Sequence, residues 1–102
     1  MIEATVHSSV QNFVTPRFNQ ASLVNARRDF ADLEAAHLSG ANLKGSSPIR
    51  ANFKSSNLIK ANFENALLME ANFDDACLIG CNFKNANLSK TYLKTAVGLT
   101  VE

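Results

Sequence analysis

Few residues of this sequence combine a side chain and a spacing that chemistry would require. His7 and His37 lie thirty positions apart, and neither joins Cys, Asp or Glu residues at metal-ligand spacing. Ser39 and Ser89 are candidate nucleophiles, but no evident base accompanies either of them. The sequence therefore predicts no catalytic residue, no metal site and no cofactor, and we expect a protein that is not an enzyme.

The structural elements that would position any site are predicted from a sequence repeat of five residues. Between positions 51 and 88 a small residue, usually Ala, recurs every fifth position, and a Leu or Phe follows it by two. An α-helix would spread this pattern around its axis, and a strand would alternate it between its two faces. The chain must therefore turn a corner once per repeat, and Gly40, Gly45 and Gly80 fall where corners are expected. Four such sides close a square coil of about twenty residues, and coils stack about 4.8 Å apart.

The pattern resembles the pentapeptide-repeat family over roughly residues 16–98. The resemblance implies an all-β fold, a right-handed quadrilateral β-helix of about four coils, whose central Leu or Phe residues fill the interior. The central residues are Phe18, Leu23, Leu33, Leu38, Leu43, Phe53, Leu58, Phe63, Leu68, Phe73, Leu78, Phe83, Leu88 and Leu93. Residues 1–15 are then an N-terminal cap, either helix or strand, and residues 99–102 are a C-terminal tail.

Two repeats depart from the pattern, because Arg28 and Pro48 take the central position one coil apart. We interpret them as a local bulge in which the backbone turns Phe30 and Ile49 inward and lets Arg28 reach solvent. The alternative is a small basic recognition patch of Arg27, Arg28 and Arg50.

Positions twenty apart share a side of the square, so the outward residues can be sorted by side. Side one carries Leu33, Phe53, Phe73 and Leu93 inward, side two Leu38, Leu58 and Leu78, side three Leu43, Phe63 and Phe83, and side four Leu68 and Leu88. Outward charges alternate in sign along side one (Glu34, Lys54, Asp74, Lys94) and along side three (Lys44, Glu64, Lys84). We interpret both ladders as solvated faces that fix the register of the coils.

Side two differs, because apolar residues form an outward column along it. The predicted partner-binding residues are Ile59, Cys77, Ile79, Val97, Leu99 and Val101. Side four has a smaller set, namely Ile49, Leu67 and Met69. The alternative explanation for both columns is β-propensity alone.

Composition limits which classes of function and which cellular locations we expect for this protein. The net charge is +1, which favours neither nucleic-acid binding nor an acidic tail. The first ten residues lack the basic and apolar regions of a signal peptide, and no run approaches the ~20 apolar residues of a membrane span. Cys77 should point outward and Cys81 inward, so we interpret them as reduced thiols of a cytoplasmic protein rather than a disulfide or a shared metal site.

We therefore expect a non-catalytic protein-interaction or scaffold module that binds an unidentified protein partner. The family also contains proteins that mimic DNA and bind topoisomerases, but the near-neutral charge argues against that alternative. An open final coil predicts a homodimer through the C-terminal coil. The competing expectation is a partner protein that docks on the same end.

Overall fold

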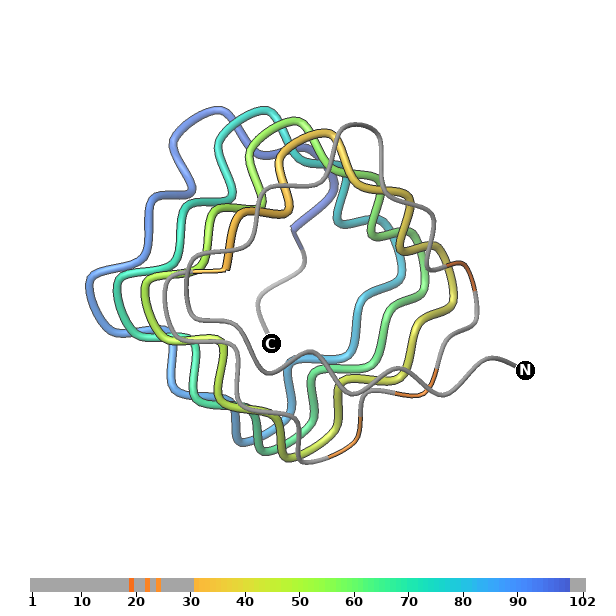
Figure 1. The fold of residues 1–102 in the computed structure, drawn as a ribbon, viewed down its shortest axis with the longest axis vertical. Coiled ribbons are helices and arrows are strands. Elements are labelled where there is room, and N and C mark those ends of the chain that lie inside the picture. Colours follow the sequence, from red (N-terminus) through yellow and green to blue (C-terminus); the bar gives the residue numbers. More distant parts are fainter. Residues whose placement is uncertain (1–18, 20–21, 23, 25–30, 100–102) are drawn as a thin grey trace.

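The computed structural model describes residues 19, 22, 24 and 31–99 of the 102-residue chain. In this part the chain winds into a square coil whose successive turns lie behind one another (Figure 1). Parallel β-bridges join residues twenty positions apart, for example Asp32 to Asn52, Asn52 to Asn72 and Asn72 to Tyr92. Each side contributes one bridging residue, and residues 31–99 contain neither a helix nor a longer strand. The predicted cap at residues 1–15 lies outside the described residues.

Each side of the square ends in a hydrogen-bonded β-turn. The backbone N–H of Ala36 donates to the carbonyl oxygen of Leu33 at 3.0 Å. Ala35, the third residue of that turn, has a φ of 59°. A positive φ at the third position is characteristic of a type II turn. The corner expected once per repeat is therefore confirmed, and every such turn from Ala35 to Lys90 has a positive φ at this position.

Glycine meets this backbone requirement at three of the corners, as expected for Gly40, Gly45 and Gly80. Thr95 takes the same place in its repeat but is not among the described residues with a positive φ. Because Thr is β-branched, it would be strongly strained there. The Leu93 carbonyl still accepts a hydrogen bond from Ala96 N at 3.1 Å, so the corner closes with a different turn geometry.

The outward Asn residues stabilise the corners. The Oδ1 atom of Asn62 accepts a hydrogen bond from the backbone N–H of Glu64 at 2.9 Å, and Asn72 does the same for Asp74 at 2.9 Å. This contact is an Asx turn, in which the side chain satisfies a backbone donor that the neighbouring coils do not reach. The Asn residues of the repeat therefore hold the fold in place rather than forming a polar binding site.

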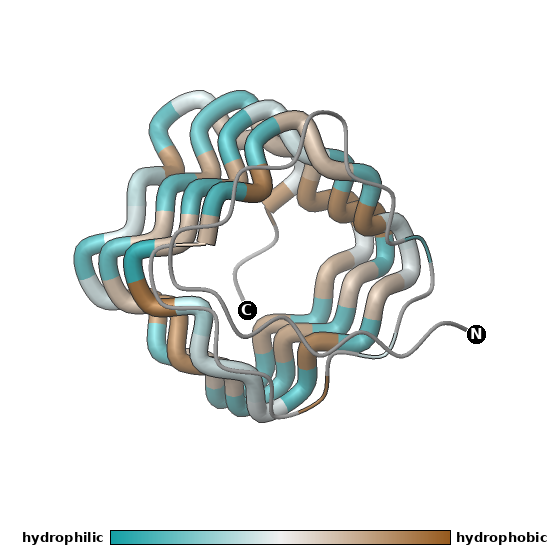
Figure 2. Tube along the Cα trace, viewed as in Figure 1, coloured by the Kyte–Doolittle hydropathy of each residue, from teal (hydrophilic) through white to brown (hydrophobic). Residues whose placement is uncertain are grey.

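The core lies along the axis of the coil. Phe53, Phe63 and Phe73 are each 0% exposed. The rings of Phe53 and Phe73 stack with centroids 5.0 Å apart, and Phe63 meets both of them edge-on. Apolar segments accordingly recur at the same place on successive turns (Figure 2). The predicted central residues from Leu33 to Leu78 are thus confirmed as the core, while Phe18 and Leu23 lie outside the described residues.

The bulge predicted at Pro48 is wrong. Pro48 is itself fully buried at the central position, and Ala51 N donates to its carbonyl at 3.1 Å as in a regular turn. Because proline has no N–H, it cannot donate to the carbonyl of Leu67, although the central residues on either side of it do make this contact with the next coil. One inter-coil hydrogen bond is lost without any change of frame. Ile49 therefore does not replace Pro48, and Arg28 and Phe30 lie outside the described residues.

Residues 81–99 form the last described coil, and its central residues Phe83, Leu88 and Leu93 are only partly buried. No described coil stacks on their far side. The expected outward place of Leu99 is wrong, because Leu99 packs against the core. Gly98 has a φ of 83°, and the described chain turns into the square at this point (Figure 1).

Candidate protein-binding surfaces

Side two presents the apolar column that the sequence predicted. Ile79 is 50% exposed and Val97 is 56% exposed, while Ile59 and Cys77 are partly exposed beside them. The predicted site therefore forms one surface for these four residues. Leu99 leaves that surface for the core, and Val101 lies outside the described residues.

Charge separates side two from the other sides. Lys60 is the one Lys or Arg of this side in the part described, and residues 36–40, 56–60, 76–80 and 96–99 contain no Asp or Glu. Gly40 and Gly80 precede and follow Lys60 in the same corner column. A Cβ atom built on Gly80 would lie 3.1 Å from Cγ of Lys60, so the aliphatic stem of the lysine covers the glycine. The result is a face of apolar side chains with a single cation at its border.

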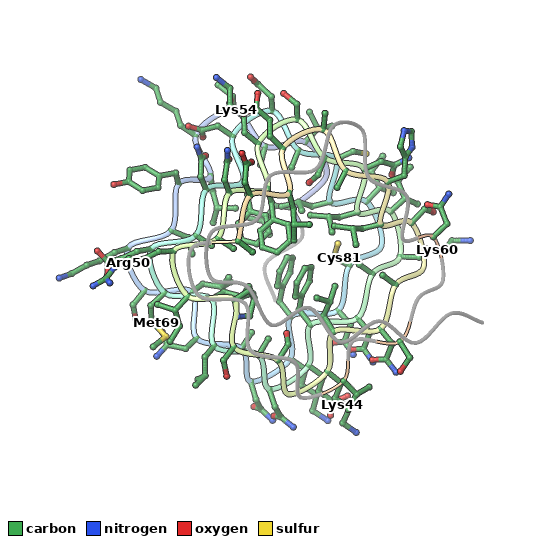
Figure 3. All side chains as sticks on the ribbon, in the orientation of Figure 1. Lys44, Arg50, Lys54, Lys60, Met69 and Cys81 are labelled. Atoms are coloured by element: carbon green, nitrogen blue, oxygen red, sulfur yellow. The ribbon has the colours of Figure 1, made fainter. Side chains whose placement is uncertain are left out.

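The two cysteines do not form a reactive pair. Cys81 points into the coil, where its Sγ lies 2.9 Å from the carbonyl oxygen of Leu58 (Figure 3). Burial raises the pKa of the Cys81 thiol to about 12, against a smaller lowering by its hydrogen bond with the backbone of Ala61. The thiol is therefore protonated at neutral pH, whereas a nucleophile or a metal ligand has to be a thiolate. Both cysteines are free, as expected.

The charge ladders of sides one and three are present, and side four carries a third ladder. Arg50, Glu70 and Lys90 occupy the same corner on successive coils. Nε of Arg50 lies 3.1 Å from Oε2 of Glu70, and both side chains are about half exposed. The alternative to the bulge placed Arg50 in a basic patch with Arg27 and Arg28, which lie outside the described residues. Sorting position 50 with positions 70 and 90 would have found the ladder.

These ladders divide the coil into layers of one sign. Residues 41–60, the first layer, carry Lys44, Arg50, Lys54 and Lys60 and no acidic residue. Residues 61–80, the second layer, carry Glu64, Glu70, Asp74 and Asp75 and no basic residue. Residues 81–99, the third layer, carry Lys84, Lys90 and Lys94 and no acidic residue.

Alternating charges along sides one and three were expected from the sequence, but this division into layers was not. The cations of the first layer project from four different sides of the square (Figure 3). The signal was available in the sequence, because cutting the chain after positions 40, 60 and 80 separates the signs completely between positions 41 and 99. Each layer therefore stabilises its neighbours through attraction between opposite charges.

No group of three or more His, Cys, Asp or Glu side chains among the described residues could hold a metal ion. No helix in the described part of the chain is long and apolar enough to span a membrane.

Comparison with known families and structures agrees with the observed coil. The family model for pentapeptide repeats matches residues 17–47, 49–85 and 76–97, with eight copies of the repeat. The crystal structure of a pentapeptide repeat protein, Rfr23 from the cyanobacterium Cyanothece 51142, is 30% identical and superimposes with a TM-score of 0.78. That alignment covers 81% of this chain and 57% of Rfr23.

Two proteins from the cyanobacterium Nostoc PCC 7120 are also similar. HetL, which is involved in heterocyst differentiation regulation, is 32% identical with a TM-score of 0.60, and the alignment covers 80% of this chain and 40% of HetL. A second pentapeptide repeat protein is 24% identical with a TM-score of 0.65, covering 93% of this chain and 75% of that protein. These matches confirm the expected right-handed quadrilateral β-helix. No functionally curated protein matches the chain significantly.

Proposed function

Because the chain belongs to the pentapeptide-repeat family, we propose that it is a non-catalytic protein-binding module of the cytoplasm whose contact surface is side two. Repeat proteins stack similar units on one another and use the extended surfaces that result for binding. HetL, a similar protein, is involved in heterocyst differentiation regulation, and regulation through protein contacts is compatible with the surface proposed here.

The observation that carries the proposal is the contrast between side two and the other sides. Ile79 and Val97 are each at least half exposed on a face that has no acidic residue in the part described. Contacts that exclude water gain most from apolar area and lose most from unpaired charge. A face with both properties therefore favours protein contact over solvent exposure.

The same charge pattern disfavours mimicry of DNA. Mimicry needs a dense anionic surface in place of the phosphates. Glu64, Glu70, Asp74 and Asp75 form a single anionic layer that lies between two cationic layers. A basic partner approaching any of the four sides would meet at least one lysine.

The proposal can be tested by photo-crosslinking in cells of the native host. A photoreactive phenylalanine analogue would replace Ile79 on side two or, as the matched control, Met69 on side four. We expect the side-two probe to form a specific adduct with one protein partner, identified by mass spectrometry, and the control probe to form none. Adding Ile59→Asp to the side-two probe should abolish the adduct, because the charge would be buried in the contact.

Equal labelling from both sides would contradict the proposal. So would an adduct that persists in the Ile59→Asp protein. Circular dichroism of each variant would show that the coil is intact, because position 59 is exposed enough to accept a charge.

A further inference from the structure

Side two has one charged residue at each of its two corners, and the two charges are opposite. Lys60 stands at the corner where side two ends, and the other described members of its corner column are Gly40 and Gly80. Asp75 stands at the corner where side two begins, and the other described members of its column are uncharged. Both side chains are exposed, and neither forms a hydrogen bond or an ion pair with another described residue. Opposite charges therefore border the apolar column of side two on its two edges.

Lys60 differs in this respect from the other cations of the first layer. Lys44, Arg50 and Lys54 each have a carboxylate at the equivalent position one coil later, whereas Lys60 has Gly80 there. Its ammonium group projects away from the coil (Figure 3). Because Lys60 belongs to no charge ladder, its charge is available to a second molecule that contacts side two.

We propose that the partner bound by side two is a second copy of the chain, whose own side two faces the first with both coils running in the same direction. This inference rests on the proposed function, because it names the occupant of the same surface. A two-fold axis parallel to the axis of the coil would place each corner of side two opposite the other corner in the second copy. Lys60 of each copy would then face Asp75 of the other, so one symmetric contact forms two ion pairs.

The heights of the two residues along the coil allow this pairing. Asp75 follows Lys60 by fifteen positions, which is three quarters of a coil of twenty residues. With coils stacked about 4.8 Å apart, their heights differ by roughly 3.6 Å, which is within the reach of a lysine side chain. The stem of Lys60 already leans toward the later coil, because its Cγ lies 3.1 Å from the place of a Cβ on Gly80. The lysine therefore extends in the direction in which Asp75 of the second copy would lie.

The same arrangement brings apolar side chains of the two copies together. Ile79 lies next to the lysine corner and Cys77 next to the aspartate corner, so Ile79 of each copy would face Cys77 of the other. Ile79 is 50% exposed and Cys77 is partly exposed. Ile59, on the preceding coil, adds apolar area beside Ile79. The contact would thus bury apolar area between the two ion pairs, as in an interface with an apolar centre and a polar rim.

Charge also selects the direction of the second copy. A two-fold axis perpendicular to the coil would place like corners opposite each other, lysine against lysine and aspartate against aspartate. Like charges that face each other oppose association. A partner of another sequence would have to supply a carboxylate and a cation at these two places, whereas a second copy has both. Charge complementarity therefore favours two parallel copies.

Exchanging the two charges tests this pairing directly. Lys60→Asp and Asp75→Lys each place like charges across the two-fold axis, so either variant alone should self-associate at least about tenfold more weakly than the unmodified protein. In a one-to-one mixture of the two variants every charged corner again meets its opposite. The mixed dimer should therefore regain the affinity of the unmodified protein, and so should a chain that carries both substitutions.

Sedimentation equilibrium at about 50 mM salt would measure these affinities, because exposed charges are weakly screened there. One side of a few coils is small compared with the ~800 Å² that each partner buries in a standard interface, so concentrations up to about 1 mM are needed. The substituted positions should accept the new residues. Lys60, Asp75 and Lys90 have φ values of 61°, 62° and 59°, so Lys and Asp both already occur at this place of the turn.

The matched controls lie on side four. Lys90→Asp and Glu70→Lys make the same changes of net charge at the same place of their turns, outside the proposed contact. Each should self-associate like the unmodified protein, and mixing the two should give no gain. This pair separates a specific contact from general attraction between oppositely charged proteins. Ile79→Asp should abolish self-association, because it would bury a charge in the contact.

Any of three results would overturn the inference. The first is an unmodified protein that stays monomeric at about 1 mM, and the second is a mixture of Lys60→Asp and Asp75→Lys that associates no more than either variant alone. The third is self-association that persists in Ile79→Asp. A monomeric chain whose photoreactive probe at position 79 still captures a different protein would remove the second copy as the occupant and leave side two as the contact surface.

Discussion

Nε of Arg50 and Oε2 of Glu70 lie 3.1 Å apart, although twenty residues separate them in the chain. The contact exists because every coil places the same corner directly beside the corner before it. Lys90 continues the series on the next coil. The stacking of the backbone thus converts a sequence spacing into an ion pair.

We expect the Arg50–Glu70 pair to contribute about 0.2–1 kcal/mol, because both side chains are about half exposed and screened by solvent. A double-mutant cycle with Arg50→Ala and Glu70→Ala, read from urea unfolding, measures the coupling free energy. The coupling should shrink as salt is added. A coupling above about 3 kcal/mol would instead indicate a pair shielded from water.

Phe73→Ala should destabilise the coil by about 3–5 kcal/mol, because Phe73 is fully buried and stacks on Phe53. Lys54→Ala, on an exposed ladder of the same side, should cost at most about 1 kcal/mol. Chemical denaturation of the two variants provides the comparison. Similar losses from both would mean that the inside and outside of the coil are wrongly assigned.

Gly98→Ala should disturb the end of the coil more than Gly80→Ala does. A Cβ atom on Gly98 would lie 2.9 Å from the backbone N of Ile79 and 2.5 Å from its Cγ1, so the chain must shift. On Gly80 the nearest atom is Cγ of the flexible Lys60 side chain at 3.1 Å, and the cost should be near the ~1 kcal/mol of Ala at positive φ. Hydrogen exchange of residues near Leu99 would report the difference, and equal protection in both variants would contradict it.

Stability should fall as the pH rises above about 9, because burial raises the pKa of Cys81 from its ordinary 9.0 to about 12. Below pH 9 the thiol is protonated in both the folded and the unfolded chain. Between the two values the unfolded chain releases the proton and the folded chain keeps it, so unfolding becomes more favourable. Cys81→Ala should remove this part of the pH dependence of urea unfolding.

Cys77→Ala is the matched control, since it removes a thiol from the outside of the preceding coil and leaves Cys81 in place. If the slope above pH 9 persisted without Cys81, another group would have to be its cause. Iodoacetamide at neutral pH should also modify Cys77 much faster than Cys81 in the folded protein.

The period of five was enough to predict the square coil and its core, because each Phe and Leu in it fills the same place on successive turns. Pro48 could not be placed in this way. Its departure from the central Leu or Phe suggested a distorted frame, whereas the regular bonds around it keep the frame unchanged. Leu99 was misplaced because the repeat alone does not show that Gly98 adopts a positive φ and redirects the chain. The candidate contact surfaces depend on how far each outward side chain is exposed, and the period predicts only whether a side chain points outward.

The single-sign layers restrict how such a protein can grow by duplication. Copying one coil of twenty residues in place, such as 61–80, would put two anionic layers side by side and set like charges against each other at every corner ladder. Copying two adjacent coils would restore the alternation. Forty residues, rather than five or twenty, is therefore the unit in which this rod can lengthen without electrostatic cost.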